Sequence, residues 1–193
     1  MNFFLIPLCY LLGSIPFSFL IAKLWRVDLR QVGSGNVGAT NVLRSVGPWP
    51  GALAFFLDFM KGWLAVYLAF LVGGGPIFVL TLGLAVIIGH TYPIFLGFKG
   101  GKGAATGLGV LAGIAPEIFA VAFIFAFAII ALTRYVSVAS ILTPWLVATL
   151  MFYWQKPIPY LCMTVIVAAF IFVRHLPNVK RLRNGTELRL GGK

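Results

Sequence analysis

Residues 104–133 read AATGLGVLAGIAPEIFAVAFIFAFAIIALT, and the division of this apolar stretch decides how many membrane spans the chain has. As one helix it would be about 45 Å long, whereas the hydrocarbon core of a bilayer is roughly 30 Å thick. Pro116 and Glu117 interrupt it, because proline removes a helix hydrogen bond and a carboxylate is costly at the bilayer centre. We therefore predict two helices, over 104–115 and 118–133. The first is short and rich in glycine, which indicates a tilted or partly buried helix packed by its small residues.

Five further apolar segments surround this stretch, approximately at 3–24, 51–72, 77–98, 135–154 and 158–173. With 61% hydrophobic and 10% charged residues, the composition lies outside the range of soluble domains. The first segment has no basic region before it, so we expect it to be retained and not cleaved as a signal peptide. The sequence thus predicts an all-α integral membrane protein, a single membrane domain over 1–193 with about seven transmembrane helices.

The basic residues indicate the orientation of these helices. The net charge of +11 does not point to nucleic acid, because the basic residues are spread between apolar segments instead of forming one stripe. With seven spans, every basic cluster falls on one side of the membrane and only Lys156 on the other; six spans would put the tail opposite the first loop. We therefore place the N-terminus outside and the C-terminus in the cytoplasm. Loops 25–50, 99–103 and 174–193 then share the cytoplasmic face.

The first of these loops contains GSGNVGATN at 33–41. Its glycines match G-x-G-x-x-G, but the loop lies between two spans and not in a βαβ unit, which excludes a dinucleotide site. Glycines let backbone N–H groups turn inward, and small polar side chains add further donors. The pattern indicates an anion-binding nest, with an ordinary polar turn as the alternative. The candidate residues are Ser34, Gly35, Asn36, Thr40, Asn41 and, just beyond them, Arg44.

The second loop contains KGGKG at 99–103, directly before a predicted helix. It is not a Walker A motif, because Leu96 stands where the first glycine belongs and Gly103 where Ser or Thr would bind magnesium. Two lysines, open backbone donors and a helix N-terminus still favour phosphate. The alternative is that the lysines contact anionic lipid headgroups. The candidates are Lys99, Gly100, Gly101, Lys102, Gly103 and Thr106, while the preceding His90 is either a packing and network residue or a catalyst.

The third loop follows the last span and runs RHLPNVKRLRNGTE at 174–187. Its His175, Asn178 and Arg181 can present an imidazole, an amide and a guanidinium to one site. The alternative is a solvated basic tail that only sets the topology. Glu187 is the only acidic residue of the tail, and we expect it to pair with an arginine or lysine instead of acting as a base.

Four residues within the apolar segments also bear on function. Asp58 and Lys61 are one helical turn apart and can pair, and we expect them to support the loops. Cys9 and Cys162 have no His or Cys at ligand spacing. They predict neither a disulfide nor a metal site, and we interpret both as small buried hydrophobic residues.

Together, the three loops resemble those of the PlsY family, the bacterial acyl-phosphate:glycerol-3-phosphate acyltransferases, over nearly the whole chain and in the same order. The resemblance implies an enzyme of the bacterial inner membrane with its active site facing the cytoplasm. It implies acyl transfer from acyl phosphate to the 1-hydroxyl of sn-glycerol 3-phosphate, giving lysophosphatidic acid and phosphate, the first acylation of phospholipid synthesis. Catalytic positions then fall on Ser34, Arg44, His175 and Asn178, a structural one on Glu187, and the phosphate loop of glycerol 3-phosphate on 99–103.

The residues are compatible with this chemistry, because an activated acyl phosphate mainly requires a positioned alcohol, a stabilised oxyanion and a held phosphate. No Ser-His-Asp relay and no H-x-x-x-x-D pattern is present, since Phe95 and Lys180 stand five residues after the two histidines. Direct attack by the glycerol hydroxyl is therefore favoured, with His175 or a substrate phosphate oxygen taking the proton. No cofactor, metal or obligate protein partner is indicated, only the two substrates and the bilayer. The competing function is a transporter of a phosphorylated metabolite, against which the one-sided loops and the lack of repeats argue.

Overall fold

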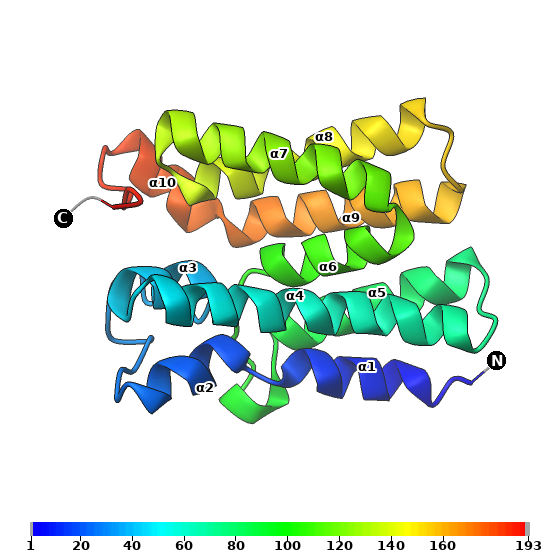
Figure 1. Ribbon diagram of the computed structural model, residues 1–193, viewed down its shortest axis with the longest axis horizontal. Helices are drawn as coiled ribbons and strands as arrows, with labels where there is room; N and C mark the ends of the chain where they lie inside the picture. The colour runs from blue at the N-terminus through cyan, green and yellow to red at the C-terminus, as the bar shows by residue number, and fades with distance from the viewer. Residues whose placement is uncertain (1, 192–193) are drawn as a thin grey trace. The chain divides into compact units, whose positions relative to one another are not determined.

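The computed structural model describes residues 2–191, and throughout this range the regular structure is helical. The expected single domain packs as two compact units, Met1–Ile114 and Ala115–Lys193, which are described separately below (Figure 1). The boundary falls beside Pro116, where the sequence predicts a break between two helices. The break is confirmed, because one helix ends at Ile114 and the next begins at Pro116.

The first unit begins with a broken membrane segment. Two short helices replace the continuous one expected over 3–24, since Pro16 interrupts the hydrogen-bond ladder. The Lys61 ammonium donates to the Ile15 carbonyl at this break (3.1 Å) and so satisfies a group that the ladder leaves open. The elements of this unit are α1 (Leu5–Ser14), α2 (Phe17–Leu24), α3 (Ala39–Ser45), α4 (Pro48–Leu71), α5 (Pro76–Thr91), the 3₁₀ helix η1 (Ile94–Leu96) and α6 (Ala104–Ile114).

Glycines allow the helices of the first unit to approach closely. On α6, a Cβ at Gly109 would overlap the Phe59 carbonyl of α4, and from the other side a Cβ at Gly62 would overlap the Thr106 carbonyl. Gly13 of α1 and Gly89 of α5 form an equivalent contact between those two helices. Close packing through small residues is typical of membrane helices. The prediction of a short helix packed by its glycines at 104–115 is therefore confirmed.

The second unit comprises α7 (Pro116–Thr133), α8 (Val136–Tyr153), α9 (Ile158–Arg174) and α10 (Leu176–Arg183). Helix α8 packs against both α7 and α9. Glu117, in the first turn of α7, forms an ion pair with Lys156 of the α8–α9 loop, so these two charges lie at the same end of the unit. Beyond α10 the chain returns to the α7–α8 turn, where the Leu190 N–H donates to the Arg134 carbonyl (2.7 Å).

Five segments in the described part of the chain are long and apolar enough to cross a membrane, and α9 with α10 adds a sixth if that bent pair is one span. At 11 residues, α6 is about 16 Å long, too short to cross a bilayer alone. The seven expected segments are all helical, while the number of spans and the orientation of the termini stay predictions. Both cysteines are free, but the prediction that both are buried is wrong for Cys162, which lies on an exposed face of α9.

Candidate active site

The conformation of the first loop depends on Asn41, which lies on α3 and is 1% exposed. Its side-chain oxygen accepts the Ser34 N–H (3.0 Å), and its amide nitrogen donates to the carbonyls of Leu29 and Val32, each at 3.0 Å. We expected Asn41 to bind substrate, and this role stays a prediction. Because both its amide oxygen and its amide nitrogen bond the loop backbone, Asn41 shapes the loop around Ser34.

The glycines of this loop form turns and do not present all of their N–H groups outward. Gly33 and Gly35 have positive φ, +58° and +69°, which other residues rarely adopt. The Gly35 N–H donates to the Val32 carbonyl and the Gly38 N–H to the Asn36 carbonyl, each at 3.0 Å. These two amides, with that of Ser34, are therefore not donors of an anion nest. Side chains with donor groups lie at the partly exposed positions Ser34, Asn36, Thr40 and Arg44.

The glycine-rich second loop is tied to the end of α5. The Gly100 N–H donates to the Thr91 carbonyl (3.1 Å) and the Gly101 N–H to the His90 carbonyl (3.2 Å). These amides cap α5, so they too are unavailable to phosphate. The first ladder bond at the start of α6 runs from the Gly107 N–H to the Gly103 carbonyl (2.7 Å), which leaves the preceding amides of this helix without ladder partners. An anion is favoured at that helix N-terminus.

The remaining candidates of the second loop differ in exposure. Lys99 is exposed and Lys102 is partly exposed, as a phosphate contact requires. Thr106 was expected to bind substrate, and this role stays a prediction; the residue is 0% exposed on α6. Its backbone carbonyl lies against α4, where a Cβ at Gly62 would overlap it, a contact that the loop sequence alone does not reveal.

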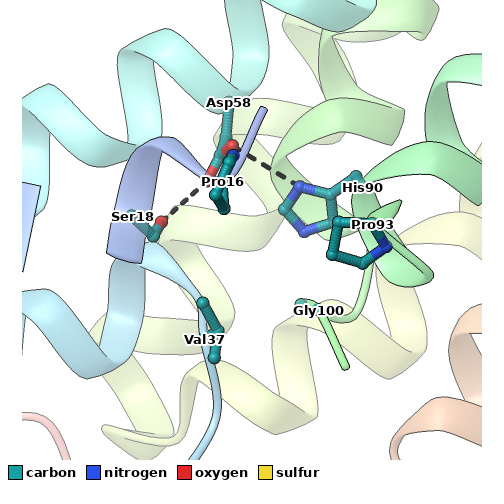
Figure 2. A pocket seen from close by; sticks show the side chains of 8 residues that line it. Pro16, Ser18, Val37, Asp58, His90, Pro93 and Gly100 are labelled. Carbon is teal, nitrogen blue, oxygen red and sulfur yellow. Dashed lines mark hydrogen bonds and ion pairs between the residues drawn. The ribbon is translucent and has the colours of Figure 1, made fainter. Parts of the chain in front are cut away.

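Behind these loops lies a buried cluster centred on Asp58. The Lys61 ammonium lies 2.7 Å from Asp58 Oδ1, which confirms the expected pairing one turn apart. His90 Nδ1 is 3.4 Å from the same oxygen, and the Ser18 hydroxyl donates to Asp58 Oδ2 (2.7 Å) (Figure 2). All four residues are at most 8% exposed. Sequence reasoning missed Ser18, because a single serine in an apolar segment carries no signal of its partner.

Although this cluster contains Ser, His and Asp, it is not a nucleophile relay. In such a relay the histidine lies between the serine and the carboxylate and accepts the serine proton. Here the Ser18 hydroxyl donates directly to Asp58, and His90 Nδ1 lies 3.4 Å from the other carboxylate oxygen. The arrangement supports the expectation that Asp58 and Lys61 organise the loops.

In the second unit, His175 lies at the junction of α9 and α10 and is 4% exposed. Its Nδ1 is 2.8 Å from the Ile171 carbonyl. A carbonyl oxygen only accepts, so Nδ1 must carry a proton and the lone pair of the neutral ring lies on Nε2. That tautomer is the one in which Nε2 can accept a proton.

Glu187 connects the other two polar residues of the third loop. Its two carboxylate oxygens accept from Asn178 Nδ2 and from Arg181 Nε, each at 2.7 Å. Burial acts to raise the pKa of Glu187, but the hydrogen bonds, that of Asn178 first, outweigh burial and hold this pKa below its usual value. The carboxylate is thus charged and paired with a basic side chain, as expected. Arg181, predicted to bind substrate, uses its Nε for this pair and remains partly exposed.

The family model for glycerol-3-phosphate acyltransferase matches residues 3–185. Glycerol-3-phosphate acyltransferase of Aquifex aeolicus is 47% identical over 187 residues, 96% of this chain and 97% of that protein. The protein of the same name from Syntrophomonas wolfei is 44% identical over 190 residues, 98% of this chain and 97% of that protein.

Two solved structures are also similar along nearly the whole chain. Both are of PlsY (YgiH), an integral membrane glycerol 3-phosphate acyltransferase. Its glycerol 3-phosphate form has a TM-score of 0.93 and 45% identity, and covers 97% of this chain and 94% of that one. Its lysophosphatidic acid form has a TM-score of 0.90 and 43% identity, with the same coverage.

Proposed function

This chain belongs to the glycerol-3-phosphate acyltransferase family and is an integral membrane acyltransferase, and we propose that it transfers its acyl group from an acyl phosphate to the 1-hydroxyl of sn-glycerol 3-phosphate. The products are lysophosphatidic acid and inorganic phosphate. The observation that carries the proposal is the chain-long similarity to a structure in a glycerol 3-phosphate form and to one in a lysophosphatidic acid form.

The proposed reaction is a direct acyl transfer. The glycerol oxygen forms a bond to the acyl carbonyl carbon, and the bond from that carbon to the phosphate oxygen breaks. The proton of the hydroxyl ends on the released phosphate. Positioning of the alcohol, stabilisation of the oxyanion and binding of the leaving phosphate are therefore the main requirements.

The described residues offer groups for each requirement. In the first unit, Lys99, Lys102 and the N-terminus of α6 suit the phosphate of glycerol 3-phosphate, while Ser34 and Arg44 hold the catalytic positions that the family resemblance implies. In the second unit, Asn178 is held by Glu187, and the His175 tautomer has its lone pair on Nε2. Two proton acceptors fit this chemistry: His175 Nε2 and a phosphate oxygen of the substrate.

Purified protein in detergent tests the function. Incubation with acyl phosphate and glycerol 3-phosphate is expected to yield lysophosphatidic acid and phosphate in equal amounts. Acyl-CoA and acylated acyl carrier protein serve as matched alternative donors and are expected to give no product. A protein that forms no ester but moves glycerol 3-phosphate across vesicles is a transporter, and the proposal then fails.

Two further measurements separate the mechanisms. His175→Ala protein that folds normally and retains substantial turnover would exclude imidazole as the obligatory base. Quenching wild-type protein during turnover is expected to reveal no acylated side chain, and an ester on Ser34 would exclude direct attack.

We also propose that the active site faces the cytoplasm of a bacterial inner membrane and needs no protein partner. A cysteine placed at Lys99 is expected to react with a membrane-impermeant thiol reagent in inverted vesicles and not in intact cells. The reverse pattern would contradict the positive-inside orientation.

A further inference from the structure

The Asp58 cluster forms one side of a small pocket in the first unit whose other walls come from both of its polar loops. Val37 of the first loop and Gly100 and Gly101 of the second line the pocket together with Asp58 and His90 (Figure 2). One buried imidazole thus lies where two loops that are far apart in sequence come together.

The second loop approaches this imidazole so closely that residue 101 has no room for a side chain. A Cβ at Gly101 would overlap His90 Nε2 and would lie 2.9 Å from His90 Cε1 and 3.0 Å from the Val37 carbonyl oxygen. A Cβ at Gly100 would overlap the His90 carbonyl oxygen. The φ angles of these two glycines lie outside the positive range, in contrast to +85° at Gly103. Glycine at 100 and 101 is therefore required by close packing on residue 90 and not by backbone conformation.

The imidazole is itself held in place by side chains of two other helices, α4 and α2. Asp58 on α4 lies against His90 Nδ1 of α5, and its carboxylate is anchored by Ser18 of α2 and by Lys61. Every polar side chain in this chain of contacts is buried, so its position is set by the helices and not by solvent. Because the packed helices fix these side chains, they also fix the imidazole, and the loop backbone that packs against the imidazole is held at a defined position.

We propose that His90, oriented by Asp58, is a positioning residue that sets the spacing between the glycine-rich loop and the first loop, and thereby the affinity for glycerol 3-phosphate. The inference rests on the proposed function and deepens it. On this explanation, residue 101 is a glycine because the His90 imidazole packs against it, and not because the loop backbone must approach a phosphate.

A double-mutant cycle tests this explanation. Asn at position 90 keeps an amide donor near the Nδ1 position that faces Asp58 but lacks the Nε2 and Cε1 atoms that a Cβ on Gly101 would meet. Gly101→Ala is expected to raise the KM for glycerol 3-phosphate about tenfold with a smaller change in kcat, and His90→Asn is expected to restore much of this loss in the double variant. His90→Gln keeps a polar atom near the Nε2 position and is expected to give no rescue.

Gly75→Ala supplies the matched control, because a Cβ there would meet no atom within 4 Å and its φ is −72°. The effects of Gly75→Ala and His90→Asn on the KM for glycerol 3-phosphate should simply multiply in the double variant. Thermal unfolding midpoints in detergent, measured for the same single and double variants, check the packing contact without any assay of turnover.

The outcomes are distinguishable. If the effects of Gly101→Ala and His90→Asn on KM simply multiply in the double variant, the inference is overturned, because the glycine then acts on substrate directly. Coupling in the unfolding midpoints without coupling in KM also overturns the positioning role. A wild-type protein that makes no lysophosphatidic acid overturns the proposed function, whatever the unfolding cycle shows.

Discussion

Asp58 and Glu187 are both buried carboxylates that bond several polar partners, one in each unit, but their surroundings differ. Asp58 lies inside α4, a helix long and apolar enough to cross a membrane, and the side chains of Asp58 and Lys61 are 2% and 1% exposed. Glu187 lies in the tail after α10, and the side chain of its partner Arg181 is 32% exposed. A charge far from water must be fully paired within the protein, whereas one at a helix end is partly relieved by solvent. The difference suggests that Asp58 matters most for folding and Glu187 most for the orientation of Asn178.

The largest effect on stability is expected from Asp58→Ala. The substitution leaves Lys61 and His90 buried without their carboxylate, which should lower the free energy of unfolding by about 3–5 kcal/mol. Thermal and chemical unfolding in detergent measure this loss. Asp28→Ala is the control, because the ion pair of Asp28 with Arg30 is exposed and its removal should leave the unfolding midpoint unchanged. Equal midpoints for the two variants would remove the distinction between a buried and an exposed carboxylate.

Glu187→Ala is expected to destabilise less and to reduce turnover more. The loss of an acceptor for Asn178 and Arg181 should lower the free energy of unfolding by about 1–3 kcal/mol. The freed Asn178 amide should reduce kcat by about tenfold or more, since small errors of orientation are costly in catalysis. Product formation is measured beside unfolding, with Asn184→Ala at an exposed position as the control. Normal kcat in folded Glu187→Ala protein would contradict the orienting role.

The low pKa of Glu187 gives this region a defined pH dependence. Because the pKa is lower in the folded protein than in the unfolded chain, the carboxylate stabilises the fold fully above the ordinary glutamate pKa of about 4.3. This stabilisation is lost as the pH falls through the lower folded value. The difference in unfolding midpoint between wild type and Glu187→Gln should therefore be constant above about pH 5 and shrink below about pH 4. A difference that grows on acidification would show that the sign is wrong.

The smallest effect is expected from Glu117→Gln. Its ion pair with Lys156 is partly exposed at both ends, with side chains 44% and 28% exposed. Its loss should cost at most about 0.5–1 kcal/mol and should matter less in high salt. Unfolding at two salt concentrations measures this. A loss as large as that of Asp58→Ala would show that exposure does not separate these carboxylates.

Several features could be predicted from the sequence because they depend on nearby residues. One helix ends at Ile114 and the next begins at Pro116, since proline cannot donate to the ladder of a preceding turn. Asp58 and Lys61 pair because one helical turn brings them together. Glycines in 104–115 indicated a closely packed helix for the same local reason. The sequence also located the three loops.

Other features depend on partners that are distant in the chain. Asn41 and Thr106 have the residue types of substrate ligands, but in the structure the Asn41 amide bonds the loop backbone and Thr106 is 0% exposed on α6. Ser18 gave no signal because its partner is 40 residues away on another helix. The glycines of the second loop likewise indicated backbone N–H groups open to a ligand, although the amides of Gly100 and Gly101 bond the end of α5.

The sequence by itself determined the membrane class, the helical segments, the break at Pro116 and the residue types at the loops, because hydropathy and backbone restrictions act over a few residues. Only the tertiary structure decided which of those polar groups remain available to a ligand. A hydrogen-bond donor is used or left open according to the acceptor that folding brings to it, and that acceptor is often far away in the chain.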